Sequence, residues 1–370
     1  MNRIRIYQRG SVIVLLFSLI FISSCSKPSE EVAVHMAFEN AKFVSSFPLN
    51  FTLDEPSQPK TDNIGLRRIR IVDSLLILDK PSSKGFWEIY KLPEYENLGA
   101  YLNMGDGPLE FKQSPSVAQK STFTDENQNL VTYLYDFQKG RILKFNISAS
   151  IANSELHLFE HDAAIPPNLF AFVFLGEDSF FIKEIANKDT QQMRYVVRDG
   201  EKQIPAVLAA LNDASIKVGE DFNILSTITR YSKQHEIFVE APIGLNNINI
   251  YKLDGSLSKS IVMGKELSDL NAIQNENRWD RKYTFSDLRL FDDFFGVVYI
   301  NEGEKNYQME RKKLPFILLF DWEGNPLAKI ETREQFTSFD IDLTNQELYT
   351  FDVKTDRFVK YDMEMIFSKL

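Results

Sequence analysis

Cysteine is almost absent from this sequence of 370 residues, which contains one, Cys25. No disulfide bond can form within one chain, so disulfides do not hold this fold together. Histidine is also scarce, with four residues, and leaves few candidates for a histidine metal site. The sequence has no G-x-S-x-G elbow, P-loop, Cys–His pair or EF-hand loop. These absences weaken hydrolase and nucleotide-binding functions.

Basic residues are outnumbered, since 42 Lys and Arg face 52 Asp and Glu for a net charge of −10. Residues 1–24 contain three arginines and no acid, so the rest of the chain carries −13. Binding to nucleic acid requires clustered Lys and Arg against the phosphates, so this balance argues against a nucleic-acid partner. It is typical of a soluble exported domain.

Near the N-terminus, a continuous apolar run covers the twelve residues from Ser11 to Ile22. This is shorter than the roughly 20 residues of a transmembrane helix, and a basic segment precedes it. Residues 1–24 are therefore predicted to be a signal peptide. The sequence Ile22-Ser23-Ser24-Cys25 resembles a bacterial lipobox, which implies that Cys25 is acylated and becomes the new N-terminus. The alternative is an ordinary secretory signal with an unrelated free thiol.

Residues 25–33 are polar and are predicted to be a lipidated tether. Two or three acyl chains anchor a protein stably, so we expect attachment to the outer membrane of a bacterial cell envelope. Glu30 and Glu31 resemble the acidic signal that exports Bacteroidetes lipoproteins to the cell surface, although they come late after the cysteine. The periplasmic face and the cell surface both remain open.

A short apolar strand after a polar turn recurs six times, starting at residues 73, 129, 178, 235, 293 and 346. Each copy continues into a second aromatic or β-branched strand and a third, the last third strand being residues 365–370. Segments such as 64–72, 224–231 and 336–343 can supply a fourth. Six repeats of four strands indicate an all-β, six-bladed β-propeller with antiparallel blades over residues 34–370. A β-sandwich is the alternative, but it does not require this period.

Three segments lie outside the repeat. Residues 206–217 and 265–281 have helix-compatible patterns and are predicted to be insertions between blades. Residues 34–52 alternate apolar and polar side chains, and we expect them to add a strand to the last blade and so close the ring.

The loop from Gly105 to Phe111 reads GDGPLEF. It resembles the G-x-G-P-x-E-F loop of the six-bladed TolB-like and NHL-like propeller lipoproteins of Bacteroidetes. The resemblance implies a lipidated propeller from a group whose members mostly lack an assigned activity, and it brings no catalytic residues. We predict a blade-linking motif of Gly105, Gly107, Pro108, Glu110 and Phe111. The glycines would permit positive φ, the proline would set the turn, and the phenylalanine would plug into the adjacent blade. A phosphate loop is disfavoured, because no third glycine or helix pattern follows.

One pattern raises the question of a zinc site. His157-Leu158-Phe159-Glu160-His161 matches the inverted zinc-peptidase motif, but it lies in a predicted strand, where the histidines are too far apart for one ion. No metal or other cofactor is therefore predicted.

Acidic residues leave one enzymatic alternative open. Propeller hydrolases hold calcium in the central channel through acids from several blades. Asp340 and Asp342 share one strand face, and Asp292 and Asp293 are further candidates. The alternative function is therefore a channel-metal hydrolase of the calcium type.

The insertion around residues 277–283 combines aromatic and basic side chains in an acidic protein. Such residues dominate binding hot spots, and tryptophan also stacks on sugar rings. The candidate partner-binding residues are Arg278, Trp279, Arg281 and Tyr283. The alternative is that Trp279 only packs this loop onto a blade. Weaker candidates, predicted to be solvated turns, are Arg230-Tyr231 and residues 311–313.

These observations favour a binding or scaffold protein over an enzyme. We expect a lipid-anchored propeller of the cell envelope whose partner is a peptide, a glycan or another envelope protein. A purely structural envelope protein without a small ligand is the third interpretation.

Overall fold

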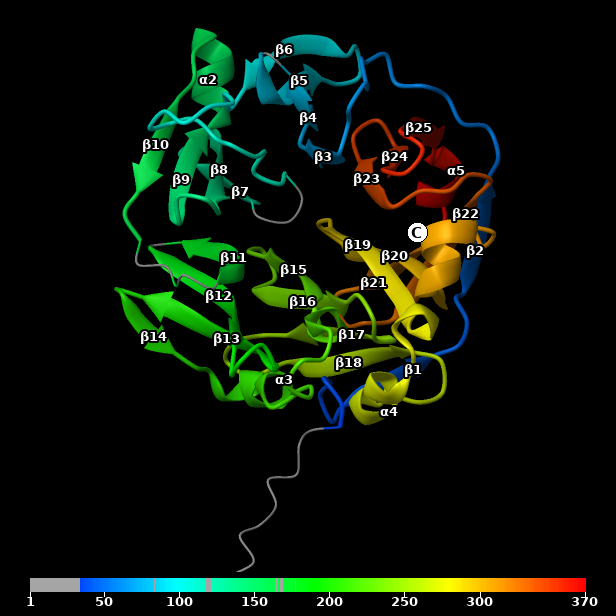
Figure 1. Cartoon of the computed structure of the whole chain (residues 1–370). Coiled ribbons are helices and arrows are strands. Elements are labelled where there is room, and N and C mark those ends of the chain that lie inside the picture. Colours follow the sequence, from blue (N-terminus) through cyan, green and yellow to red (C-terminus); the bar gives the residue numbers. More distant parts are fainter. Residues whose placement is uncertain (1–33, 83, 118–120, 164–165, 167–168, 177) are drawn as a thin grey trace, which may run out of the picture. The chain divides into compact units, whose positions relative to one another are not determined.

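The structure, a computed structural model, describes residues 34–370 except residues 83, 118–120, 164–165, 167–168 and 177. The predicted signal peptide, Cys25 and the tether at residues 25–33 lie outside the described residues. In the described part, six sheets stand in a ring around a common centre (Figure 1). The prediction of an all-β, six-bladed propeller is confirmed.

The strands of each blade follow one another from the centre outward, as far as the structure describes them. The first, innermost strands are β3 (Arg68–Val72), β7 (Ser121–Glu126), β11 (Leu169–Gly176), β15 (Thr227–Ser232), β19 (Lys282–Leu290) and β23 (Ser338–Asp342). The second strands are β4 (Leu75–Ser82), β8 (Asn129–Asp136), β12 (Ser179–Ala186), β16 (Ile237–Pro242), β20 (Phe294–Gly303) and β24 (Glu347–Asp352). The third strands are β5 (Gly85–Lys91), β9 (Arg141–Asn146), β13 (Gln191–Arg198), β17 (Asn247–Tyr251), β21 (Phe316–Asp321) and β25 (Arg357–Asp362). The fourth strands are β6 (Glu96–Tyr101), β10 (Leu158–His161), β14 (Glu201–Gln203), β18 (Ser258–Met263) and β22 (Pro326–Thr332).

The core is divided among the contacts between blades. Alternate side chains of a strand point to opposite faces of its sheet, and each face of a blade packs against a neighbouring blade. In β4, Ile77 packs in a cluster with Leu134 of blade two, whereas Leu76 packs in a cluster with Tyr349 of blade six. A comparable hydrophobic cluster lies at every one of the six interfaces. Burial on both faces explains why the second strands are nearly continuous in apolar residues.

The N-terminal strands do not join the last blade, so the prediction for residues 34–52 is wrong in this respect. β1 (Ala41–Val44) adds in parallel to β18 of blade four, and β2 (Leu49–Leu53) adds in parallel to β22 of blade five. The alternating pattern correctly indicated edge strands, but every blade offers an outer edge with unpaired backbone groups. Local sequence does not distinguish these edges.

Blade six contains three strands, and the expected strand at residues 365–370 is wrong. These residues belong instead to the helix α5 (Glu364–Phe367) and the turn after it. The Glu364 amide donates to Asp362 Oδ1 at 2.7 Å, and Ile366 is buried in the cluster between blades five and six. The outer edge of β25 is covered by Ser57, whose backbone exchanges two hydrogen bonds with Lys360. The ring therefore closes by side-chain packing between blades six and one.

Short helices occupy the connections, and the predicted insertions are confirmed. The helical segments of the described residues are α2 (Ile147–Asn153), η1 (Ala206–Leu208), α3 (Ala209–Asn212), η2 (Phe222–Leu225), α4 (Leu270–Asn275), η3 (Arg278–Asp280) and η4 (Asn306–Glu310), in addition to α5. In this part of the chain, none of them is long and apolar enough to cross a bilayer.

Candidate functional site

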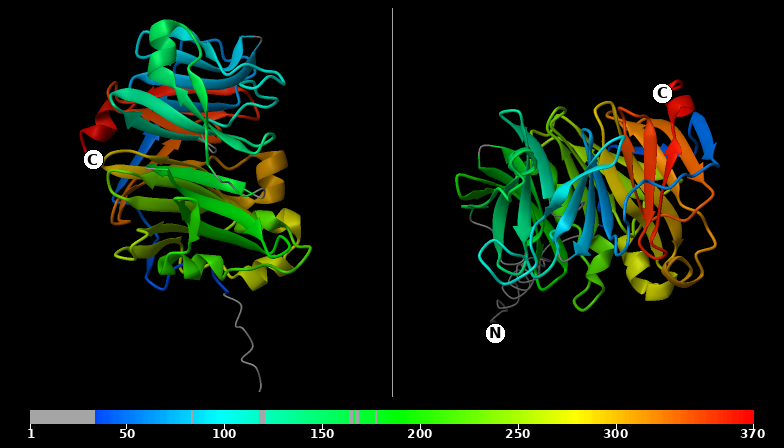
Figure 2. Two further views of the ribbon diagram at one scale, coloured as in Figure 1. Left: turned by 90° about the vertical axis from the view of Figure 1, so that its left-hand side faces the viewer. Right: turned by 90° about the horizontal axis from the view of Figure 1, so that it is seen from above.

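The ring has two faces with different connections, because the strands of each blade alternate in direction. We call the hairpin face the one that carries the turns between first and second strands, such as residues 233–236. We call the linker face the one that carries the segments joining successive blades, such as residues 264–281. The linker segment with α4 projects from the ring in yellow (Figure 2).

The predicted partner-binding residues lie on the linker face, where Arg281 and Tyr283 line one cavity of about 260 Å³. Arg281 donates to the carbonyl oxygens of Ile273, Gln274 and Glu276, and so holds the end of α4 in place. Tyr283 stacks on Tyr307 with ring centroids 4.4 Å apart, and burial raises the pKa of its phenol. Both side chains are therefore engaged within the protein.

The other two predicted residues remain accessible. Trp279 is 46% exposed. The Arg278 side chain is 59% exposed, and its Nε lies 3.3 Å from Asp221 Oδ2. Partner binding by this pair stays a prediction, with Trp279 as the exposed aromatic surface.

The GDGPLEF loop joins blade one to blade two. Phe111 is buried in the cluster between these blades, together with Trp87 and Phe145. The Glu110 carboxylate accepts a hydrogen bond from the Gly107 amide at 2.8 Å, and a Cβ at residue 105 would lie 2.0 Å from Glu110 Oε2.

Blade two holds the same loop from outside. Lys139 donates to the carbonyl oxygens of Gly107 and Glu110, and Arg141 donates to that of Pro108. The expected positive φ is absent at Gly107, so its φ does not explain this glycine. At both positions a Cβ would lie within 3 Å of the Glu110 carboxylate, so a larger residue would require that side chain to move.

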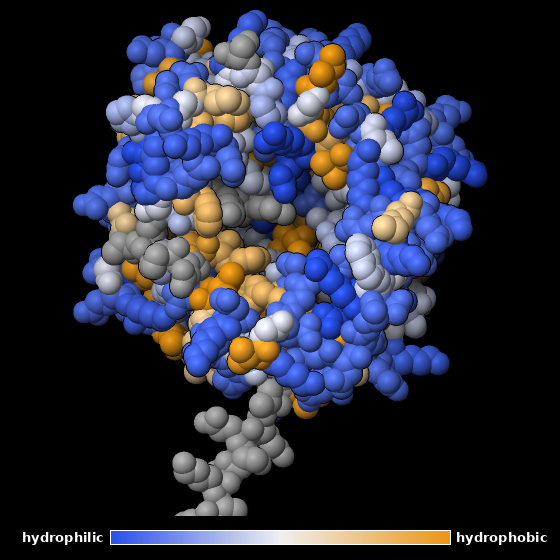
Figure 3. Space-filling model, in the orientation of Figure 1, coloured by the Kyte–Doolittle hydropathy of each residue, from blue (hydrophilic) through white to orange (hydrophobic). Residues whose placement is uncertain are grey.

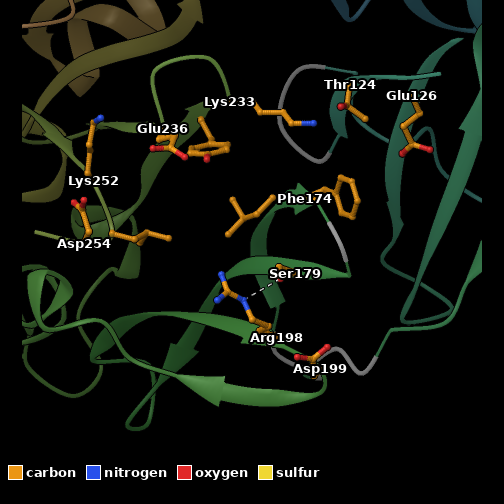
Figure 4. Close-up of a pocket in the computed structure, with 14 residues that line it drawn as sticks. Thr124, Glu126, Phe174, Ser179, Arg198, Asp199, Lys233, Glu236, Lys252 and Asp254 are labelled. Atoms are coloured by element: carbon orange, nitrogen blue, oxygen red, sulfur yellow. Dashed lines mark hydrogen bonds between the residues drawn. The ribbon is translucent and has the colours of Figure 1, made fainter. Parts of the chain in front are cut away.

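A cleft of about 790 Å³ lies on the hairpin face of blades two to four (Figure 4). It is formed where the strands of these blades end and their turns begin. Phe174, Leu175, Tyr231 and Leu253 supply its apolar and aromatic surface. Half of its 14 lining residues are charged: Glu126, Arg198, Asp199, Lys233, Glu236, Lys252 and Asp254.

The charges of the cleft are distributed along its wall. Burial alone would raise the pKa of Glu126, but hydrogen bonds from Lys144 and Tyr133 outweigh it and lower that pKa. Hydrogen bonds from Ser256 lower the pKa of Asp254. Arg198 Nε donates to Ser179 Oγ at 3.3 Å (Figure 4). Two carboxyl groups of the cleft, those of Glu126 and Asp254, therefore have lowered pKa values, and three cationic side chains line the same cleft.

The acids proposed for a channel metal are engaged separately. Asp340 Oδ2 lies 3.3 Å from Arg70 and 3.2 Å from Arg289, whereas Asp342 accepts hydrogen bonds within the turn that follows β23. Asp292 and Asp293 are exposed on the hairpin face. Among the described residues, no group of three or more His, Cys, Asp or Glu is placed to hold a metal ion. These positions give the calcium alternative no support.

A buried polar network joins blades three and four. The Glu240 carboxylate accepts from Arg194 at 2.8–3.1 Å and from Tyr251 at 2.8 Å. Burial would raise the pKa of Glu240, but Arg194 and Lys183 outweigh it and lower that pKa to about 2. The network is enclosed by the two sheets, and its role is to tie them together.

Sequence reasoning missed the residues of the cleft and of the ring centre. Arg230-Tyr231, predicted to be a solvated turn, lies on β15. Both residues line a small cavity at the centre of the ring, and Tyr231 also lines the cleft. That prediction is wrong. The available signal was an arginine inside a short strand that precedes an apolar one, as at Arg70 and Arg289.

No known family profile matches the chain, and no curated protein matches it in sequence. Among solved structures, a Bacteroides fragilis protein predicted to be exported has a TM-score of 0.49 and 12% identity, over 84% of this chain and 88% of that chain. A member of the DUF4221 family from Bacteroides vulgatus has a TM-score of 0.49 and 11% identity, over 86% of this chain and 96% of that chain. Identities this low with TM-scores below 0.5 establish neither a common family nor a common function. The TolB-like and NHL-like resemblance therefore stays a prediction.

Proposed function

We propose that this protein is a lipid-anchored propeller of the bacterial cell envelope that binds a partner in the cleft on its hairpin face. The observation that carries the proposal is the cleft itself, about 790 Å³ in volume and lined by residues of three successive blades. Ligand sites are typically concave, with apolar surface and a few fixed polar groups, and this cleft combines both.

The charges of the cleft favour one of the partner classes expected from the sequence. Cationic side chains such as Lys233 and Lys252 lie close to carboxylates such as Glu236 and Asp254 (Figure 4). A segment that carries both signs of charge complements such a surface, and paired charges select partners by orientation. A peptide segment of another envelope protein meets this requirement better than a neutral glycan.

Anchoring through Cys25 supports the same function. Acylation would hold the ring near the outer membrane, on its periplasmic face or at the cell surface, where envelope proteins are concentrated. The excess of acidic residues in the exported chain suits a soluble domain that works beside a membrane without binding it by charge.

Photo-crosslinking in cells tests the proposal directly. The full chain would carry a benzophenone amino acid at Lys252 in the cleft, at Trp279 on the linker face, or at Met365 on α5. Met365 is 57% exposed and serves as the control surface. We expect a discrete ultraviolet-dependent adduct from position 252 and none from position 365.

An adduct at position 279 alone would move the binding site to the linker face. No adduct at either position would refute partner binding by these surfaces. The Cys25→Ser protein tests the anchor in parallel: we expect it to lose incorporation of a palmitate analogue and to leave the membrane fraction.

A further inference from the structure

The centre of the ring contains a small cavity with an unusual charge. Its volume is about 100 Å³, and side chains from five of the six innermost strands contribute to its wall. Among the described residues, the charged side chains that line it are three arginines, Arg70, Arg230 and Arg289. The ring is hollowed at its centre, as the space-filling view shows (Figure 3).

Two carboxylates lie behind these arginines. Arg289 is fully buried, and its Nη1 lies 2.6 Å from Asp287 Oδ1 while its Nε lies 3.2 Å from Asp340 Oδ2. The same Asp340 oxygen also accepts from Arg70 Nη1 at 3.3 Å and from the Ile71 amide at 2.8 Å. Two carboxylates therefore face three guanidinium groups, and one carboxylate oxygen is shared by two of them.

The third guanidinium belongs to Arg230 on β15. Its Nη1 donates to the Thr229 carbonyl at 2.8 Å. Burial, followed by the like charge of Arg289, lowers the pKa of Arg230 to about 9. A guanidinium whose charged form is disfavoured in this way gains most from a nearby anion.

The remaining wall of the cavity suits an anion of few atoms. Thr122, Phe123, Thr229 and Tyr231 also line the cavity, and the Arg70 guanidinium lies 5.9 Å from the centroid of the Phe123 ring. The volume exceeds what one water molecule occupies, about 30 Å³, and admits a group of a few heavy atoms.

We propose that the centre of the ring is a binding site for a small oxyanion, a phosphate or a carboxylate, held by Arg70 and Arg230 with Arg289 behind them. Guanidinium groups present paired N–H donors that match the oxygens of carboxylate and phosphate, and such charge-assisted bonds are strong when they are buried. A bound anion adds negative charge beside this cluster of three guanidinium groups. This site does not depend on a partner in the cleft.

Thermal unfolding of the full chain in detergent tests the proposal with sodium phosphate and with sodium acetate as probes. The ionic strength is held constant with sodium chloride. We expect at least one oxyanion to raise the melting temperature in a saturable way, because a ligand that binds only the native state stabilises it. Phosphate and acetate in separate arms show which oxyanion the site takes.

The variant Arg230→Gln is expected to raise the apparent dissociation constant about tenfold or more, because it removes a buried charge-assisted bond. Arg333→Gln is the matched control, since Arg333 is exposed and pairs with Asp54 far from the centre; it should respond as the wild type does. Arg230→Lys keeps the positive charge but lacks the paired N–H donors of a guanidinium, so we expect intermediate affinity. This variant tests the proposal if Arg230→Gln does not fold. No stabilisation beyond chloride, or equal affinity in the Arg230 and Arg333 variants, would overturn the proposal.

Discussion

Lys183 is a fully buried lysine at the contact of blades three and four. Its ammonium group donates to the carbonyl and hydroxyl oxygens of Thr227 and to the hydroxyl of Thr229. Burial lowers its pKa from 10.5 to about 7, against the opposing attraction of Glu240. Between these two values the unfolded chain binds a proton that the native protein does not.

Stability should therefore rise with pH through this window. The unfolded state holds the extra proton, so the slope is positive, about 1.4 kcal/mol per pH unit when fully developed. Relative to Lys183→Met, we expect the free energy of unfolding of the wild type to rise by about 2 kcal/mol from pH 7 to pH 9. Urea titrations of both proteins at the two pH values measure it. The exposed Lys233→Met is the control and should follow the wild type; parallel behaviour of Lys183→Met would contradict the prediction.

At the scale of elements, the N-terminal strands are the least predictable part of the fold, and they extend blades four and five at their outer edges. β2 contributes Phe51 to the cluster between blades five and six, and this side chain is 7% exposed. β1 carries Phe43, which is 52% exposed. The two phenylalanines occupy neighbouring edge strands and differ in burial.

Replacing Phe51 by alanine should destabilise the protein by about 3 kcal/mol, because it leaves a cavity in a packed cluster. Phe43→Ala should change the free energy of unfolding by less than about 0.5 kcal/mol, as is usual for exposed positions. Chemical denaturation monitored by tryptophan fluorescence compares them. Equal effects would mean that β2 does not pack on blade five as described.

At the scale of the whole molecule, Asp340 links three blades where the ring closes. It lies on β23 of blade six and contacts Arg289 of blade five, Arg70 of blade one and the Ile71 amide. Closure thus depends on a buried carboxylate as well as on the cluster that contains Tyr349.

The variant Asp340→Asn should lower the free energy of unfolding by about 3–5 kcal/mol, because it removes the buried counter-charge that Arg70 and Arg289 share. Asp54→Asn removes an exposed partner of Arg333 and should change it by less than about 1 kcal/mol. Thermal and urea unfolding measure both. A mild effect of Asp340→Asn would show that packing alone closes the ring.

The repeat of apolar strands, with its period of roughly 50 residues, was enough to predict the six blades, because burial of both sheet faces leaves a local trace in every copy. The insertions with α3 and α4 were visible because they interrupt this repeat with helix-compatible patterns. The last helix was missed, because a four-residue helix leaves no periodic pattern.

The candidate site could not be obtained from the sequence in the same way. The cleft joins residues as distant as Glu126 and Asp254, and the central cavity joins Arg70 to Arg289. The sequence by itself determined that short strands alternate with turns and that the second strand of each blade is buried on both faces. Only the tertiary structure decided which side chains converge, because the closure of the ring brings the innermost strands together regardless of their separation along the chain.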